Sequence, residues 1–164
     1  MNPRSIPGLD VEGPVQAEVF AVFRDEDRLN LTGPCGADAW YIEVGAEEDP
    51  MAVVAVAVRR VIGEPVVVHS TSWRRDRGGV LLSFVAVIDR RLAAGMTAAP
   101  VTRAELARGG ADTAPETVAT QSVLEHGLRH LAWLVKDDPA VAAALDQGWC
   151  AALSGYVPEP FRHL

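Results

Sequence analysis

Histidines with metal-ligand spacing are the first residues that could carry chemistry. His126 and His130 stand four apart in a stretch of helical periodicity, so both imidazoles would share one helix face and could bind one metal ion. His69 or His163 could add a third ligand, although nothing in the sequence brings either close. Gly127 stands where a zinc-peptidase motif has its catalytic glutamate, so a general base is missing. The alternative is a polar helix face with solvated histidines.

Arginines supply a second group of candidates. A guanidinium can donate two parallel hydrogen bonds to a phosphate, so clustered arginines predict a small anionic ligand. The candidate ligand-binding arginines are Arg59, Arg60, Arg74, Arg75 and Arg77. The alternative is that they are solvated charges at the end of a helix and at the tip of a hairpin.

An imidazole also stands beside hydroxyl groups in the segment His69–Ser72. Alternate residues of a strand share one face, so His69 pairs with Thr71 rather than with Ser70. We expect His69 and Thr71 to line a ligand pocket. The alternative is a catalytic triad, but the sequence has no Gly-x-Ser-x-Gly nucleophile elbow.

The composition predicts one folded domain over residues 1–164. The chain is 49% hydrophobic and carries 15 Lys and Arg against 22 Asp and Glu, a net charge of −7. That acidic balance argues against a nucleic-acid partner. The longest apolar run, Met51–Val58, is far shorter than the roughly 20 residues that cross a bilayer. The first residues do not resemble a secretory signal, so we expect a soluble, cytoplasmic protein.

Hydrophobic periodicity and cap residues predict the order of the elements. Strands are expected at 15–24, 28–32, 39–44, 65–73 and 79–89, the last two central and buried. Helices are expected at 50–62, 102–109, 115–136 and 139–145, the last of them ending near Gly148. Helix 50–62 is expected to face the sheet with Met51, Val54, Ala55, Val58, Val61 and Ile62.

This order predicts an α+β fold, because strands come first and helices later. We expect a mixed or antiparallel central sheet, with the helix at 50–62 on one face and C-terminal helices on another surface. A linker at 93–100 separates a sheet-rich part, 1–92, from a helical part, 101–155.

The segment from Trp40 to Arg59 resembles the first half of the sequence box of Nudix hydrolases. Gly45 and Arg59 stand fourteen residues apart, as that box requires, and Trp40 and Ile42 precede the glycine as they do in many members. The resemblance implies a Nudix-like fold with a cleft for nucleotides or other phosphorylated ligands.

The carboxylates of the box are missing. Met51 stands at the position of its first glutamate, Arg60 replaces the glutamate after the arginine, and Gly63 comes three residues early. In the family those carboxylates hold the divalent cations that catalyse hydrolysis. The resemblance therefore implies a non-catalytic protein, with no cofactor expected. A divalent metal stays open through displaced acidic residues: Glu43, Glu47 and Glu48.

These patterns leave different function classes open. The first is a non-enzymatic protein that binds a small anionic ligand or a protein partner. The second is a metal-dependent hydrolase that uses His126 and His130. The third is a structural or assembly module, such as a homodimer, in which C-terminal aromatic residues either pack the helices or form the interface: Trp133, Trp149, Tyr156 and Phe161.

Overall fold

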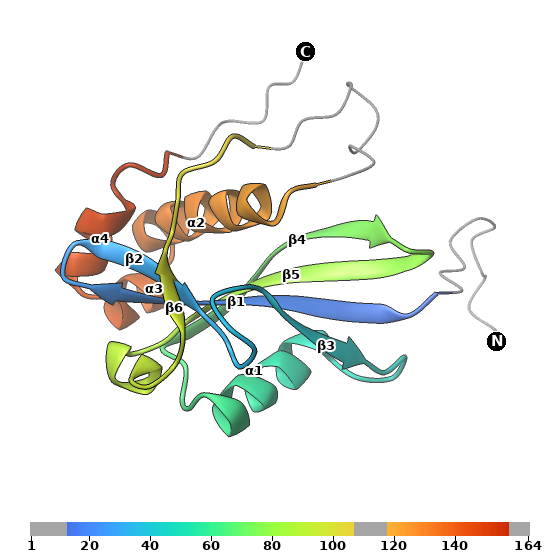
Figure 1. Ribbon diagram of the computed structural model, residues 1–164. Coiled ribbons are helices and arrows are strands. Elements are labelled where there is room, and N and C mark those ends of the chain that lie inside the picture. Colours follow the sequence, from blue (N-terminus) through green and yellow to red (C-terminus); the bar gives the residue numbers. More distant parts are fainter. Residues whose placement is uncertain (1–12, 107–117, 158–164) are drawn as a thin grey trace, which may run out of the picture.

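The computed structural model describes residues 13–106 and 118–157, which form a mixed six-stranded sheet with helices on both faces (Figure 1). The predicted α+β class is confirmed. The strands are β1 (Val15–Asp25), β2 (Arg28–Thr32), β3 (Trp40–Val44), β4 (Val67–Asp76), β5 (Gly79–Val87) and β6 (Ala98–Pro100). The helices are α1 (Pro50–Val61), α2 (Thr120–Asp137), α3 (Pro139–Ala144) and α4 (Gln147–Leu153), with a 3₁₀ turn, η1 (Arg90–Ala93), after β5.

Strand β1 lies at the centre of the sheet. It pairs in parallel with β5, and its opposite edge is shared, because β3 pairs with Val15–Val19 and β2 with Ala21–Asp25. The order β4–β5–β1–β2–β6 makes β4 an edge strand. The expectation that the strand at 65–73 is central is therefore wrong. This edge strand still has an apolar run, because both of its faces are covered: Val67 packs toward α2 and Val68 toward α1.

The sheet separates two hydrophobic cores. On β1, Phe20 and Val22 pack toward α2 and α4, whereas Val19 and Ala21 pack toward α1 and η1. Figure 1 shows α2 and α1 on opposite sides of the sheet. Strand β1 is thus buried on both faces, which only a three-layer arrangement allows. The C-terminal helices share the first core with the sheet. No helix of the described residues is long and apolar enough to cross a membrane.

Helix α1 begins where its sequence signals predict. The Asp49 carboxylate accepts a hydrogen bond from the backbone N–H of Met51 at 3.1 Å and caps the helix. The buried residues of α1 are Val54 and Val58. The expectation that Met51 and Val61 face the sheet is wrong, because their side chains are exposed to solvent; Val61 is 54% exposed.

The segment after β6 differs from the prediction of a helix at 102–109. Residues 102–106 are not helical, and the Glu125 carboxylate of α2 binds this segment. It accepts hydrogen bonds from the Arg103 side chain at 3.1 Å and from the Ala104 backbone N–H at 3.3 Å. The rest of that predicted helix and the start of the one at 115–136 lie outside the described residues.

Strand β6 and helix α4 were not expected from the sequence. Strand β6 lies in the predicted linker at 93–100 and pairs with β2. Helix α4 contains Gly148, which was expected to end a helix, because Asp146 caps a new one through the backbone N–H of Trp149 at 3.0 Å. These short elements depend on pairing and capping contacts rather than on a long periodic pattern.

Helix α2 approaches β5 closely at Gly127. A Cβ atom built there would lie 2.7 Å from Cγ2 of Val85 and 3.4 Å from Cγ2 of Thr71. The missing side chain therefore lets the helix backbone pack directly on the sheet.

We predict that Gly127→Val lowers the free energy of unfolding by about 1–3 kcal/mol, because the added methyl groups push α2 away from Val85. Gln121→Val, at an exposed position of the same helix, should change it by less than about 0.5 kcal/mol. Urea denaturation of both variants tests this. Equal effects would mean that the contact at Gly127 is not tight.

Candidate functional site

Arg74, a predicted anion-binding residue, is held by a buried carboxylate. Its Nη2 donates to Oε2 of Glu18 at 2.9 Å, and the Ser83 hydroxyl donates to Oε1 of the same carboxylate at 2.6 Å. Glu18 lies on β1 with no exposed surface. Its hydrogen bond to Arg74 raises the pKa of the guanidinium. A buried carboxylate needs such a partner, so Arg74 neutralises an internal charge.

A β-bulge decides which arginine reaches Glu18. The register between β4 and β5 shifts between Ser70 and Ser72, so Ser72 pairs with Ser83 and Arg74 follows on the face that carries Glu18. Without the bulge, strict alternation from Ser70 would turn Arg74 to the opposite face. The irregularity therefore selects Arg74 over Arg75.

The remaining predicted arginines do not gather at one place. Arg75 and Arg77 are exposed at the tip of the β4–β5 hairpin. Arg59 and Arg60 lie at the end of α1, which leads into the other end of β4. Ten residues of strand, about 30 Å, separate these ends. Arg59 is also paired with Glu64 at 3.0 Å, so its guanidinium is already engaged.

His69 joins the predicted histidine pair. Its Nε2 lies 3.2 Å from Nδ1 of His130, because β4 runs beside α2. The ring of His126 is 6.4 Å from that of His130, centroid to centroid. The Trp133 ring stacks on the His130 ring, with the two centroids 5.6 Å apart and the planes nearly parallel. His163 lies outside the described residues.

The surroundings of His69 and His130 lower the pKa of both rings. Burial lowers the pKa of His69, and the nearby His130 lowers it further, while Asp138 acts in the opposite direction. Burial also lowers the pKa of His130, with a smaller contribution from His126. Two neutral imidazoles can share one hydrogen bond, in which one ring donates and the other accepts.

Thr71, predicted to line a pocket with His69, packs between β4 and α2. Its hydroxyl donates to the backbone oxygen of Ser83 at 3.3 Å, and its methyl group faces Gly127. Within residues 13–106 and 118–157, no three His, Cys, Asp or Glu side chains are placed to hold a metal ion together. This covers the displaced carboxylates Glu43, Glu47 and Glu48.

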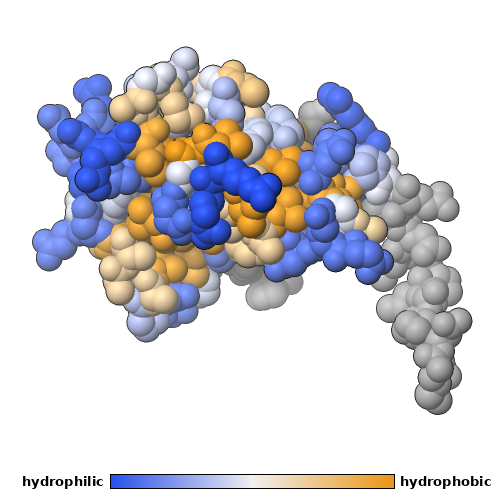
Figure 2. Space-filling model, turned by 90° about the horizontal axis from the view of Figure 1, so that it is seen from below, coloured by the Kyte–Doolittle hydropathy of each residue, from blue (hydrophilic) through white to orange (hydrophobic). Residues whose placement is uncertain are grey.

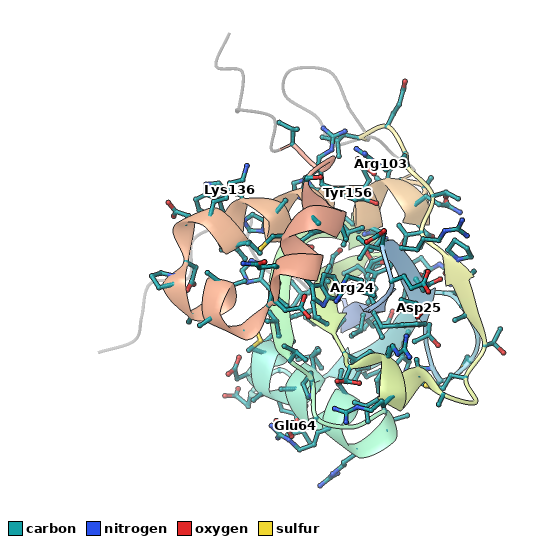
Figure 3. The ribbon with its side chains drawn as sticks, turned by 90° about the vertical axis from the view of Figure 1, so that its left-hand side faces the viewer. Arg24, Asp25, Glu64, Arg103, Lys136 and Tyr156 are labelled. Carbon is teal, nitrogen blue, oxygen red and sulfur yellow. The ribbon has the colours of Figure 1, made fainter. Side chains whose placement is uncertain are left out.

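A second buried carboxylate was not singled out from the sequence. Glu125 on α2 accepts from Nη2 of Arg103 at 2.8 Å and from Nε of Arg129 at 2.9 Å. Burial alone would raise the pKa of Glu125, but the hydrogen bonds from both arginines outweigh it and lower that pKa. The Arg103 guanidinium also lies 4.2 Å from the centre of the Tyr156 ring, and Figure 3 shows the two side by side.

A cleft of about 440 Å³ opens where β1, η1 and α4 meet. Arg24 lies near the middle of this side of the molecule in Figure 3 and packs against Gly148. The ion pairs around the cleft are Arg24–Asp146, Arg90–Asp25 and Arg91–Asp89. Each guanidinium is matched by a carboxylate, so the cleft carries no surplus of positive charge. Sequence spacing offers no signal for it, because Arg24–Asp146 and Arg90–Asp25 join residues far apart in the chain.

The outer side of α1 is apolar. A shallow groove there is lined by Glu48, Asp49, Ala52, Val53, Val56, Ala57, Arg60 and Val61. Val56, at its centre, is 40% exposed. Figure 2 looks at this side of the molecule and shows hydrophobic residues gathered across its middle, interrupted by hydrophilic side chains. A helix with apolar residues on all sides is usually covered by other protein.

Comparison with known proteins found no protein-family model and no curated protein that matches this chain. The resemblance to Nudix hydrolases therefore stays a prediction.

We predict that Arg74→Ala lowers the free energy of unfolding by about 3–5 kcal/mol, because it leaves Glu18 buried without its counter-charge. The matched control is Arg75→Ala, one residue along at an exposed position, which should change stability by less than about 0.5 kcal/mol. Chemical denaturation of both variants gives the comparison. A loss of similar size in both would show that the pair contributes little.

We further predict that acid weakens the contact between β4 and α2. The folded state lowers the pKa of His69 and His130 below 6.5, so the unfolded chain binds more protons once the pH falls below that value. The free energy of unfolding is therefore unaffected by these histidines above about pH 6.5. It decreases as the pH falls from there toward the lowered pKa values of His69 and His130 in the folded state.

Urea denaturation at several pH values between about 7.5 and 5 measures this loss, because most carboxylates stay ionised there. The slope of stability against pH should flatten in His130→Gln. An unchanged slope in that variant would contradict the assignment.

Proposed function

We propose that the protein is a non-catalytic assembly module, and that its outer α1 surface binds a second copy of the chain. The observation that carries this proposal is the pattern of residues along the exposed groove. The residues that define this α1 stripe are Asp49, Ala52, Val53, Val56, Ala57 and Arg60. Steps of three and four residues lead from Asp49 to Ala52 and Val53, from these to Val56 and Ala57, and from these to Arg60, so the set forms one continuous row on the helix surface.

The α1 stripe is complementary to itself when two helices run antiparallel. Asp49 stands at its N-terminal end and Arg60 at its C-terminal end, on a helix about 18 Å long. A two-fold axis through the middle would set Asp49 of each copy against Arg60 of the other. A parallel arrangement would bring like charges together instead. Charge complementarity therefore favours the antiparallel pair.

The centre of the α1 stripe suits close helix packing. In the antiparallel register that pairs Asp49 with Arg60, Ala52 faces Ala57 and Val53 faces Val56. Small alanine side chains allow the helix axes to come close, and the valines lose their exposed surface. Arg60 has no ion-pair partner among the described residues, so it is available to the second copy.

The other binding hypotheses have less support in the geometry. The predicted anion-binding arginines lie at two ends of β4, and both Arg59 and Arg74 are engaged by carboxylates. The binding of a small anionic ligand stays a prediction, because these arginines do not come together at one site. The missing carboxylates of the Nudix-like box support a role in binding rather than hydrolysis.

We predict that the protein sediments as a dimer at concentrations of roughly 100 µM, which requires an association free energy of only about 5.5 kcal/mol. Val56→Glu should raise the dimer dissociation constant at least about 100-fold, because it places a charge in the apolar centre of the interface. Sedimentation velocity ultracentrifugation over a concentration series measures this. The control is Val66→Glu, which changes an equally exposed valine outside the groove.

The end-to-end charge pair is tested by a double-mutant cycle. Asp49→Ser removes the charge while keeping a residue that can cap α1, and Arg60→Gln removes its partner. Each change should weaken the dimer, and the double variant should be weakened by less than the sum of the two. A monomer at every concentration, or a dimer that Val56→Glu leaves intact, would overturn the proposal.

A further inference from the structure

The histidines at the junction of β4 and α2 form a cluster that lies outside the α1 stripe. His69 and His130 lie on the side of the sheet that α2 covers, whereas α1 covers the other side. Their facing nitrogens, Nε2 of His69 and Nδ1 of His130, are 3.2 Å apart. Both rings are only partly buried, so an ion in solution can reach them.

We propose that His69 and His130 together bind a transition-metal ion such as Zn²⁺, Ni²⁺ or Cu²⁺. Two imidazole nitrogens at 2.0–2.1 Å from one tetrahedral zinc ion lie about 3.3 Å from each other. The observed separation of 3.2 Å is close to this value. Imidazole nitrogen is a good ligand for each of these metals.

His126 is the side chain best placed to complete the coordination. It precedes His130 by one helical turn, on the same face of α2, and its ring is exposed. No third ligand is in position among the described residues, so His126 must rotate toward the pair or water must fill the remaining positions. We therefore expect a binding site with open positions. Gly127, packed on Val85, offers no general base beside it.

Metal binding at this pair needs no net loss of protons. In the metal-free protein, one ring donates its N–H to the other across the 3.2 Å contact. On binding, that proton moves to the far nitrogen of its own ring, and both facing nitrogens donate lone pairs to the metal.

The test is a titration of the full-length, untagged protein with Zn²⁺ by calorimetry and with Ni²⁺ by tryptophan fluorescence. Trp133 stacks on His130, so a bound paramagnetic ion should quench its emission. We expect saturable binding of one ion per chain. His69→Ala and His130→Ala should each weaken binding at least tenfold, and His126→Ala should weaken it less. Trp133→Phe should bind Zn²⁺ normally but lose the quenching.

Two further variants keep the result interpretable if an alanine variant unfolds. His69→Gln and His130→Gln retain polar side chains of similar length and should also lose the tightly bound ion. The proposal is overturned if wild-type protein shows no saturable binding. It is also overturned if the folded glutamine variants bind Zn²⁺ as tightly as the wild type. Neither result depends on whether α1 pairs two copies, since binding is measured per chain.

Discussion

The fully buried carboxylate of Glu18 is the constraint on which the centre of this structure depends. It lies on the central strand, between β5 and β3, where water cannot solvate it. Its counter-charge must therefore come from within the protein, and it comes from Arg74 on the edge strand β4, beyond β5. The bulge in β4 makes this pairing possible, because only the shifted register turns Arg74 toward Glu18. One ion pair thus links the order of the strands, their register and the choice of arginine.

Glu125 repeats this principle in the helical layer. It draws Arg103, from the segment after β6, onto α2, and Arg103 in turn covers the ring of Tyr156. Strands, helices and the segment before residue 158 are thereby joined through one carboxylate. Arg74, which the sequence suggests as a ligand-binding residue, instead neutralises the buried carboxylate of Glu18. Counting such residues predicts a ligand site poorly when buried acids compete for them.

The two proposed surfaces are independent because the sheet separates them. The α1 stripe lies on one side and the histidine pair on the other, so association through α1 leaves the histidines accessible. Each proposed site contains side chains that solvent can reach in the folded chain. Val56 exposes apolar surface, and the facing nitrogens of His69 and His130 belong to rings that are only partly buried.

The sequence by itself determined the local elements whose signals are complete within a few residues. Asp49 and Pro50 start α1, an apolar run marks β5, apolar residues at helical spacing mark α2, and the order of these elements predicts the α+β class. Only the tertiary structure decided how distant residues meet. His69 reaches His130, Glu18 takes Arg74, and β6 joins β2 through contacts that no local spacing encodes. The physical reason is that periodicity reports which face of an element is buried, whereas strand order, bulges and buried charges decide what that face touches.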